Sequence, residues 1–211
     1  MNVTYPRLAV WKKIGIWMVM AMMLLACTMS PSQERQRYQL IEAGKVRPVA
    51  AARPPVSILV MQPKAVDGYD TDQMLYVSKP YQVSAFANNA WMSSPGTMLV
   101  PLLARSLESS HYFYAVTSEP NISKTDYRLE STIIHLQQNF LFKPSHIQLE
   151  MQVVLTHGAD NRLVAADNIY EDLPCLTDNP VGGVIAANHA TRHLTARVTR
   201  FVIDRIAHDR K

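Results

Sequence analysis

The sequence has few cysteines and few glycines: Cys27 and Cys175 are its two cysteines, and it has 7 glycines among 211 residues. It contains no C-x-x-C pair, no G-x-S-x-G elbow and no glycine-rich loop of the kind that cradles phosphate. These absences argue against a dithiol redox protein, a serine hydrolase with a nucleophile elbow and a nucleotide-binding enzyme.

The chain also carries little net positive charge once the first 26 residues are set aside. The whole chain has 21 basic and 17 acidic residues, and Arg7, Lys12 and Lys13 lie in that first segment, which has no acidic residue. The remainder therefore carries 18 basic residues against 17 acidic ones, without a basic cluster. We expect no nucleic-acid binding. The length that remains suits one domain with a sizeable core.

The apolar run of residues 14–26 is too short to cross a membrane, because a spanning helix needs about 20 residues. A short apolar run after a basic flank is instead typical of a signal peptide, which we predict for residues 1–26. Leu24-Leu25-Ala26-Cys27 reads as a bacterial lipobox. We therefore predict that Cys27 is lipidated, begins the mature chain and anchors it to a membrane.

Thr28 stands where an aspartate would most commonly signal retention at the inner membrane. The sequence thus favours the periplasmic face of the outer membrane. With Cys27 acylated, Cys175 has no internal disulfide partner. The carboxylates Glu171, Asp172 and Asp178 disfavour a reactive thiolate nearby, so we interpret Cys175 as a buried structural thiol.

After a polar tether over residues 27–36, residues 37–211 are expected to form a single domain. Period-two alternation is clearest where apolar residues at 147, 149, 151, 153 and 155 separate polar ones, which predicts a half-buried strand. The expected strands are 37–41, 56–61, 75–78, 81–85, 111–116, 126–138, 146–155 and 162–170. Residues 88–96 are predicted to be a loop, followed by a helix that Thr97 caps and that Pro101 delays. A second helix is predicted over 180–207.

No residues are singled out as catalytic or metal-binding. His189 and His193 have the spacing of a zinc-binding pair, but no glutamate lies between them, so we interpret them as exposed helix surface. The alternative is a two-histidine metal site. We expect the remaining candidates to be solvated or satisfied locally: Asp67, Asp70, Asp72, His135, His146 and His157.

The order of these features resembles the ABC-type transport auxiliary lipoprotein family, which includes the outer-membrane lipoprotein of the Pqi system. The lipobox, Tyr38-Gln39-Leu40, the hairpin, Asn89-Ala90-Trp91-Met92-Ser93-Ser94-Pro95 and the leucine-rich helix after it carry the resemblance. The family usually has an arginine before the tryptophan, where this chain has Ala90. Trp91 and Pro95 are candidates for partner docking or for core packing.

The resemblance implies an α+β fold of two layers, a mixed and mostly antiparallel sheet with two main helices on one face. It implies a non-enzymatic accessory component of an ABC and MCE type system that moves lipid between membranes. The implied partners are an MCE-domain periplasmic protein and inner-membrane transport components, with phospholipid as a possible ligand and no cofactor. Two alternatives stay open, a stand-alone lipid carrier and an assembly factor for an outer-membrane protein.

Overall fold

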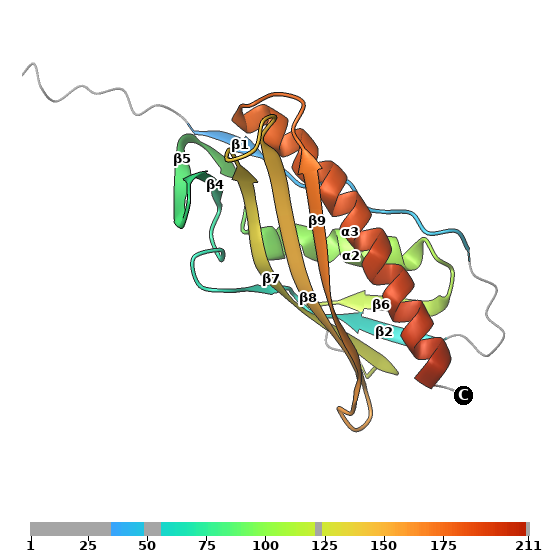
Figure 1. The fold of residues 1–211 in the computed structure, drawn as a ribbon. Helices are drawn as coiled ribbons and strands as arrows, with labels where there is room; N and C mark the ends of the chain where they lie inside the picture. The colour runs from blue at the N-terminus through green and yellow to red at the C-terminus, as the bar shows by residue number, and fades with distance from the viewer. Residues whose placement is uncertain (1–34, 49–55, 121–123, 210–211) are drawn as a thin grey trace, which may run out of the picture. The chain divides into compact units, whose positions relative to one another are not determined.

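The computed structural model describes residues 35–48, 56–120 and 124–209. The predicted signal peptide and Cys27 lie outside these residues. The described chain forms one compact unit from Arg35 onward. It combines a mixed sheet with two helices (Figure 1), which confirms the predicted α+β class.

One sheet joins all nine strands of the described chain. Its main path runs β1-β5-β4-β7-β2-β6, while β3 also pairs with β7, and β8 and β9 extend from β7. The antiparallel ladders β7–β8 and β8–β9 are the longest, β4–β5 is also antiparallel, and the other ladders are parallel. The strands are β1 Gln36–Tyr38, β2 Val56–Val60, β3 Lys64–Ala65, β4 Gln73–Lys79, β5 Gln82–Trp91, β6 Phe113–Ser118, β7 Tyr127–Asn139, β8 His146–His157 and β9 Leu163–Pro174.

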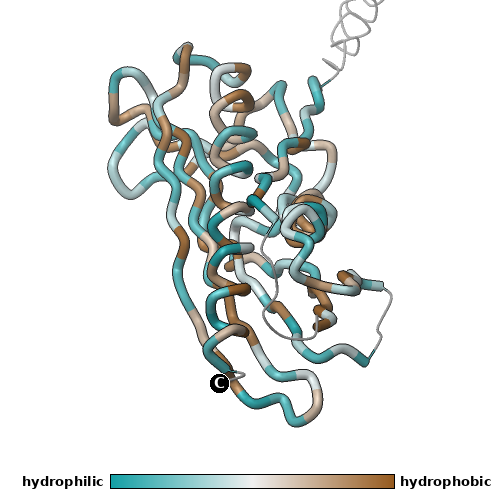
Figure 2. The backbone as a smooth tube through the Cα atoms, turned by 90° about the vertical axis from the view of Figure 1, so that its right-hand side faces the viewer, coloured by the Kyte–Doolittle hydropathy of each residue, from teal (hydrophilic) through white to brown (hydrophobic). Residues whose placement is uncertain are grey.

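The long strands alternate between core and solvent, as their sequence predicts. Along β8, Ile147 is 3% exposed and Leu149 is fully buried, whereas the residues between the apolar positions are partly or fully exposed. The same alternation of hydrophobic and hydrophilic residues is visible along the tube in Figure 2. Because side chains on a strand point alternately to its two faces, one face of this sheet is left to be covered.

Two helices cover that face, α2 Pro95–Glu108 and α3 Pro180–Asp209. The α3 helix packs along β8 and β9, α2 packs against β2 and β6, and the two helices touch each other. Their close approach uses small side chains: Ser106 Oγ lies 2.8 Å from Thr199 Oγ1 and 3.0 Å from the carbonyl oxygen of Thr195. Within the residues that the structure describes, neither helix is long and apolar enough to span a bilayer.

The start of α2 was predicted incorrectly. The helix begins at Pro95, after the N-cap residue Ser94, rather than after Thr97. Proline suits the first helical position because its φ angle is already helical and its missing N–H is not needed there. Pro101 lies inside the helix and does not delay it. Pro101 has no N–H to donate to the carbonyl of Thr97, four residues earlier, and Thr97 is exposed to solvent.

The ends of β1 and β5 also differ from the sequence-based expectation. Residues 88–91 are not in a loop, because β5 continues to Trp91 and pairs there with β1. Gln36, assigned to the tether, already belongs to β1, and that strand ends at Tyr38 because the next residues turn toward α3. There, the side-chain amide of Asn188 donates to the carbonyl of Gln39 at 3.1 Å.

Candidate functional site

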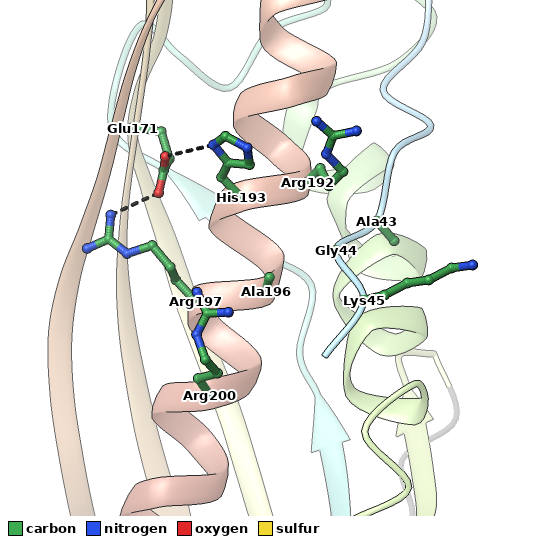
Figure 3. Close-up of a pocket in the computed structure, with 9 residues that line it drawn as sticks. All are labelled: Ala43, Gly44, Lys45, Glu171, Arg192, His193, Ala196, Arg197 and Arg200. Carbon is green, nitrogen blue, oxygen red and sulfur yellow. Dashed lines mark hydrogen bonds and ion pairs between the residues drawn. The ribbon is translucent and has the colours of Figure 1, made fainter. Parts of the chain in front are cut away.

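A surface groove with an excess of basic side chains lies between α3 and the segment that precedes β2. Its volume is about 690 Å³. We call it the cationic groove, and Figure 3 shows its lining residues: Ala43, Gly44, Lys45, Glu171, Arg192, His193, Ala196, Arg197 and Arg200.

Helical spacing gathers the basic side chains of α3 in two rows. Residues four apart lie one above the other on a helix. Arg192, Ala196 and Arg200 therefore form one row, and His193 and Arg197 form the other (Figure 3). The helix thus supplies most of the positive charge, and it does so on the side that faces away from the sheet core.

The opposite wall depends on Gly44. A Cβ atom at this position would clash with the carbonyl oxygen of Arg192 and would lie 2.6 Å from Cβ of Ala196. The Gly44 N–H donates to Thr195 Oγ1 at 2.8 Å, which fixes the segment against the helix. Close backbone packing at Gly44 therefore holds this wall of the groove against α3.

Glu171 neutralises part of the charge. Its side chain is only 10% exposed, and its carboxylate lies 2.8 Å from Arg197 Nη1 and 3.6 Å from His193 Nδ1. The same Arg197 nitrogen donates to the carbonyl of Tyr170 at 2.8 Å. These contacts tie α3 to β9 and satisfy a buried carboxylate.

Two of the remaining cations have no acidic partner. Arg192 Nη1 lies 3.4 Å from Glu42 Oε2, but no described carboxylate is within ion-pair distance of Lys45 or Arg200. The lining contains no hydroxyl or thiol nucleophile. The groove is thus suited to holding an anionic group by charge rather than to covalent chemistry.

The paired histidines on α3 contact different carboxylates. His189 lies 4.0 Å from Glu42, and His193 approaches Glu171. Both side chains are nearly half exposed, at 44% and 47%. Across the described part of the chain, no three histidine, cysteine, aspartate or glutamate side chains come together as a metal site would require.

The strand histidines have local partners. His146 Nδ1 lies 2.6 Å from Asp172, and His157 Nδ1 lies 2.9 Å from Asp160. Burial alone would raise the pKa of Asp172, but its hydrogen bonds, led by that from His146, outweigh this effect and lower the pKa. In the loop before β4, Asp72 forms an ion pair of 3.7 Å with Arg37.

Cys175 is a buried thiol, as predicted. It is 2% exposed, and burial raises the pKa of its thiol. Gln138 Nε2 lies 3.6 Å from its Sγ atom and 2.9 Å from Ser145 Oγ. A raised pKa keeps the sulfur protonated and therefore weakly nucleophilic.

The structure places Trp91 and Pro95 in the interior. Trp91 is 3% exposed at the end of β5, and its backbone N–H donates to the carbonyl of Asp72 at 2.7 Å. Pro95 is buried in the first turn of α2. The indole belongs to the main core cluster, so it contributes to packing, while a docking role for either residue stays a prediction.

Sequence reasoning found only part of the cationic groove. The sequence predicted only that His193 lies on the exposed surface of its helix. It gave no sign of Lys45 or Glu171, which come from other elements. The available signal was the i, i+4 row of Arg192, Ala196 and Arg200, which predicts a basic stripe but not the wall opposite it.

Comparison with solved structures shows that this fold recurs. A crystal structure of a protein from Xanthomonas campestris matches with a TM-score of 0.71 at 20% identity, covering 82% of this chain and 98% of that chain. A crystal structure described as an uncharacterized protein matches with a TM-score of 0.64 at 18% identity, covering 80% and 99%. At such identities the similarity concerns the fold alone.

No match was found among curated proteins. A family model, described as ABC-type transport auxiliary lipoprotein component, matches residues 38–199. The match extends from the end of β1 into the second half of α3, and so covers both helices and most of the sheet. The chain belongs to the family of ABC-type transport auxiliary lipoprotein components.

Proposed function

We propose that this protein is the membrane-anchored accessory component of a system that moves lipid between two membranes. Its anchor is an acylated Cys27 in the inner leaflet of the outer membrane, and its partner is a periplasmic MCE-domain protein served by inner-membrane transport components. The observation that carries the proposal is the match to the auxiliary lipoprotein family over residues 38–199, in a chain whose preceding segment contains a lipobox.

We assign contact with the partner to the cationic groove. A transport accessory of this kind binds and positions another protein and needs no catalytic group of its own. The groove supplies Lys45 and Arg200, which have no acidic partner in the described chain, and its lining contains no hydroxyl or thiol group. A partner segment rich in aspartate and glutamate has the complementary charge, which favours fast and specific association.

The two alternatives from the sequence have less support. A carrier would need an enclosed apolar cavity for an acyl chain. The groove is instead open and lined by charged side chains. No observation on the described residues favours an assembly factor over a transport accessory.

The proposal is tested by site-specific photocrosslinking in intact cells, followed by capture through a C-terminal tag and mass spectrometry of proteins and lipids. A photoreactive amino acid replaces Arg200 in the groove. The matched control replaces Tyr114, which is 67% exposed on β6 and outside the groove. We expect the Arg200 position to crosslink to an MCE-domain protein and the Tyr114 position not to do so.

The same experiment is repeated with Cys27→Ala, which removes the acceptor of the lipid. We expect this variant to lose both membrane association and the crosslink. Recovery of lipid without a protein partner would instead support the carrier, and recovery of an outer-membrane barrel protein would support the assembly factor.

A further inference from the structure

Large apolar side chains are exposed at the end of the domain where α3 begins. They come from the β7–β8 turn, the β9–α3 loop and the first two turns of α3. Their exposed fractions lie between 40% and 81%. We call this set the apolar end, and it consists of Leu141, Phe142, Leu176, Val181 and Ile185.

Hydrogen bonds hold the three segments of the apolar end together. The Cys175 N–H donates to the carbonyl of Ser145 at 2.7 Å, and the Ser145 N–H donates to Asp178 at 2.6 Å. Gln138 Nε2 donates to the carbonyl of Asn179 at 3.2 Å. These hydrogen bonds link the β7–β8 turn to the β9–α3 loop that leads into α3. The loops at the end farthest from the C-terminus include hydrophobic stretches (Figure 2).

The described chain begins at this same end. Figure 1 shows β1, the β7–β8 turn and the start of α3 together, opposite the C-terminus and the β8–β9 turn. Arg35 is only four residues before Gln39, whose carbonyl is held by Asn188 in the third turn of α3. Cys27 lies eight residues before Arg35. Even a fully extended chain of that length reaches at most about 29 Å.

We propose that the apolar end rests on the lipid surface in which Cys27 is anchored. This inference depends on the anchor in the proposed function. The tether length keeps the domain close to the membrane, and its attachment point turns this end toward the lipid. Phe142 sits beside Lys143, and aromatic and lysine side chains are typical of the membrane interface, where the lysine extends its charge toward the headgroups.

The size of the apolar end suits a weak contact with lipid better than an interface between two copies of the chain. Five partly exposed side chains offer a patch on the order of 500 Å². Each copy in a stable dimer buries about 800 Å². A weak contact suffices next to an anchor, because the tether makes the second contact intramolecular and gives it a high effective concentration.

The test uses the full-length lipidated protein in vesicles of phosphatidylethanolamine and phosphatidylglycerol that contain a spin-labelled phospholipid as quencher. A fluorophore is attached through Phe142→Cys at the apolar end. The matched control carries it through Asp160→Cys in the β8–β9 turn, at the other end of the domain. Cys175 is 2% exposed and does not compete for the label.

We expect the label at position 142 to lose most of its emission and the label at position 160 to keep it. A second variant, Leu176→Cys, should behave like Phe142→Cys. Equal quenching of both ends, or none at either end in protein that floats with the vesicles, would overturn the inference and leave the anchor intact.

Mass spectrometry of the Cys27 peptide separates the two proposals. A chain that is not acylated and does not float with the vesicles would overturn the anchor, and this inference with it. Burial of position 142 that depends on protein concentration and not on vesicles would show that a second copy covers the apolar end, which also contradicts the inference.

Discussion

A row of titratable side chains crosses β7, β8 and β9 on the face of the sheet away from the helices. His135 is paired with Glu150, and Glu150 with Tyr170, in the strand register. The Tyr170 hydroxyl donates to Asp172 at 2.8 Å. Desolvation, that hydrogen bond and the charge of Asp172 together raise the pKa of Tyr170 to about 12. The hydroxyl therefore remains protonated, and a hydrogen-bond donor, over the whole pH range in which the protein is expected to fold.

His135 makes the stability of the domain depend on pH. Its pKa is lowered, chiefly because burial disfavours the charged ring, and Glu150 and Asp172 only partly oppose this effect. Below the unfolded pKa of about 6.5, the unfolded chain binds a proton that the folded chain does not. The free energy of unfolding should therefore fall as the pH drops below this value, and His135→Gln should reduce that fall. Urea denaturation of both proteins at several pH values measures the free energy of unfolding.

The control for this prediction is His208→Gln, because His208 is 58% exposed in the last turn of α3. This variant should keep the pH dependence of the wild-type protein. If His135→Gln and the wild-type protein had parallel stability curves between about pH 8 and pH 5.5, the buried ring would not be the source of the effect.

At the scale of elements, the sequence predicted those whose pattern is local. The alternation over 147–155 correctly predicted the buried face of β8, and the second helix was predicted where α3 lies, because each pattern depends only on neighbours in the chain. The end of β5 was missed because its strand character depends on pairing with β1, far away in sequence. The start of α2 was missed because Thr97 is a residue type that caps helices well, whereas the actual N-cap residue, Ser94, makes no side-chain capping hydrogen bond.

Gly44 illustrates a contact that no local pattern predicts. Its backbone lies against α3 so closely that any side chain would meet the carbonyl of Arg192 and the side chain of Ala196. Gly44→Ala should therefore lower the free energy of unfolding by about 2 kcal/mol, since overpacking of this kind forces the backbone to move. Lys45→Ala is the neighbouring control, because its side chain is exposed and should change stability little. Thermal or urea unfolding compares the two, and equal stability of both variants would contradict the packing argument.

At the scale of the whole molecule, α3 links the apolar end to the cationic groove. Val181 and Ala196 are fifteen residues apart on this helix, which corresponds to about 22 Å along its axis. With the apolar end on the lipid, the groove would stand at most about that far from the membrane. An anchored domain would thus hold its partner site at a fixed height, which a flexible tether alone cannot do.

This arrangement predicts that partner binding depends on the charge of the groove and not on the net charge of the domain. The double variant Lys45→Glu with Arg200→Glu should weaken capture of an MCE-domain partner about tenfold, which corresponds to roughly 1.4 kcal/mol. Both residues line the groove, are exposed and have no acidic partner among the described residues, so the unfolding temperature should stay the same. The control variant Arg105→Glu with Arg205→Glu changes the net charge equally, but at exposed positions outside the groove.

Salt concentration provides the second measurement. Because exposed charges are screened within about 8 Å at physiological ionic strength, the difference between the wild-type protein and the groove variant should shrink as salt is added. The control variant should bind the partner like the wild-type protein at every salt concentration. Equal weakening by both double variants would mean that the partner responds to the overall charge of the domain, and the groove would then not be its binding site.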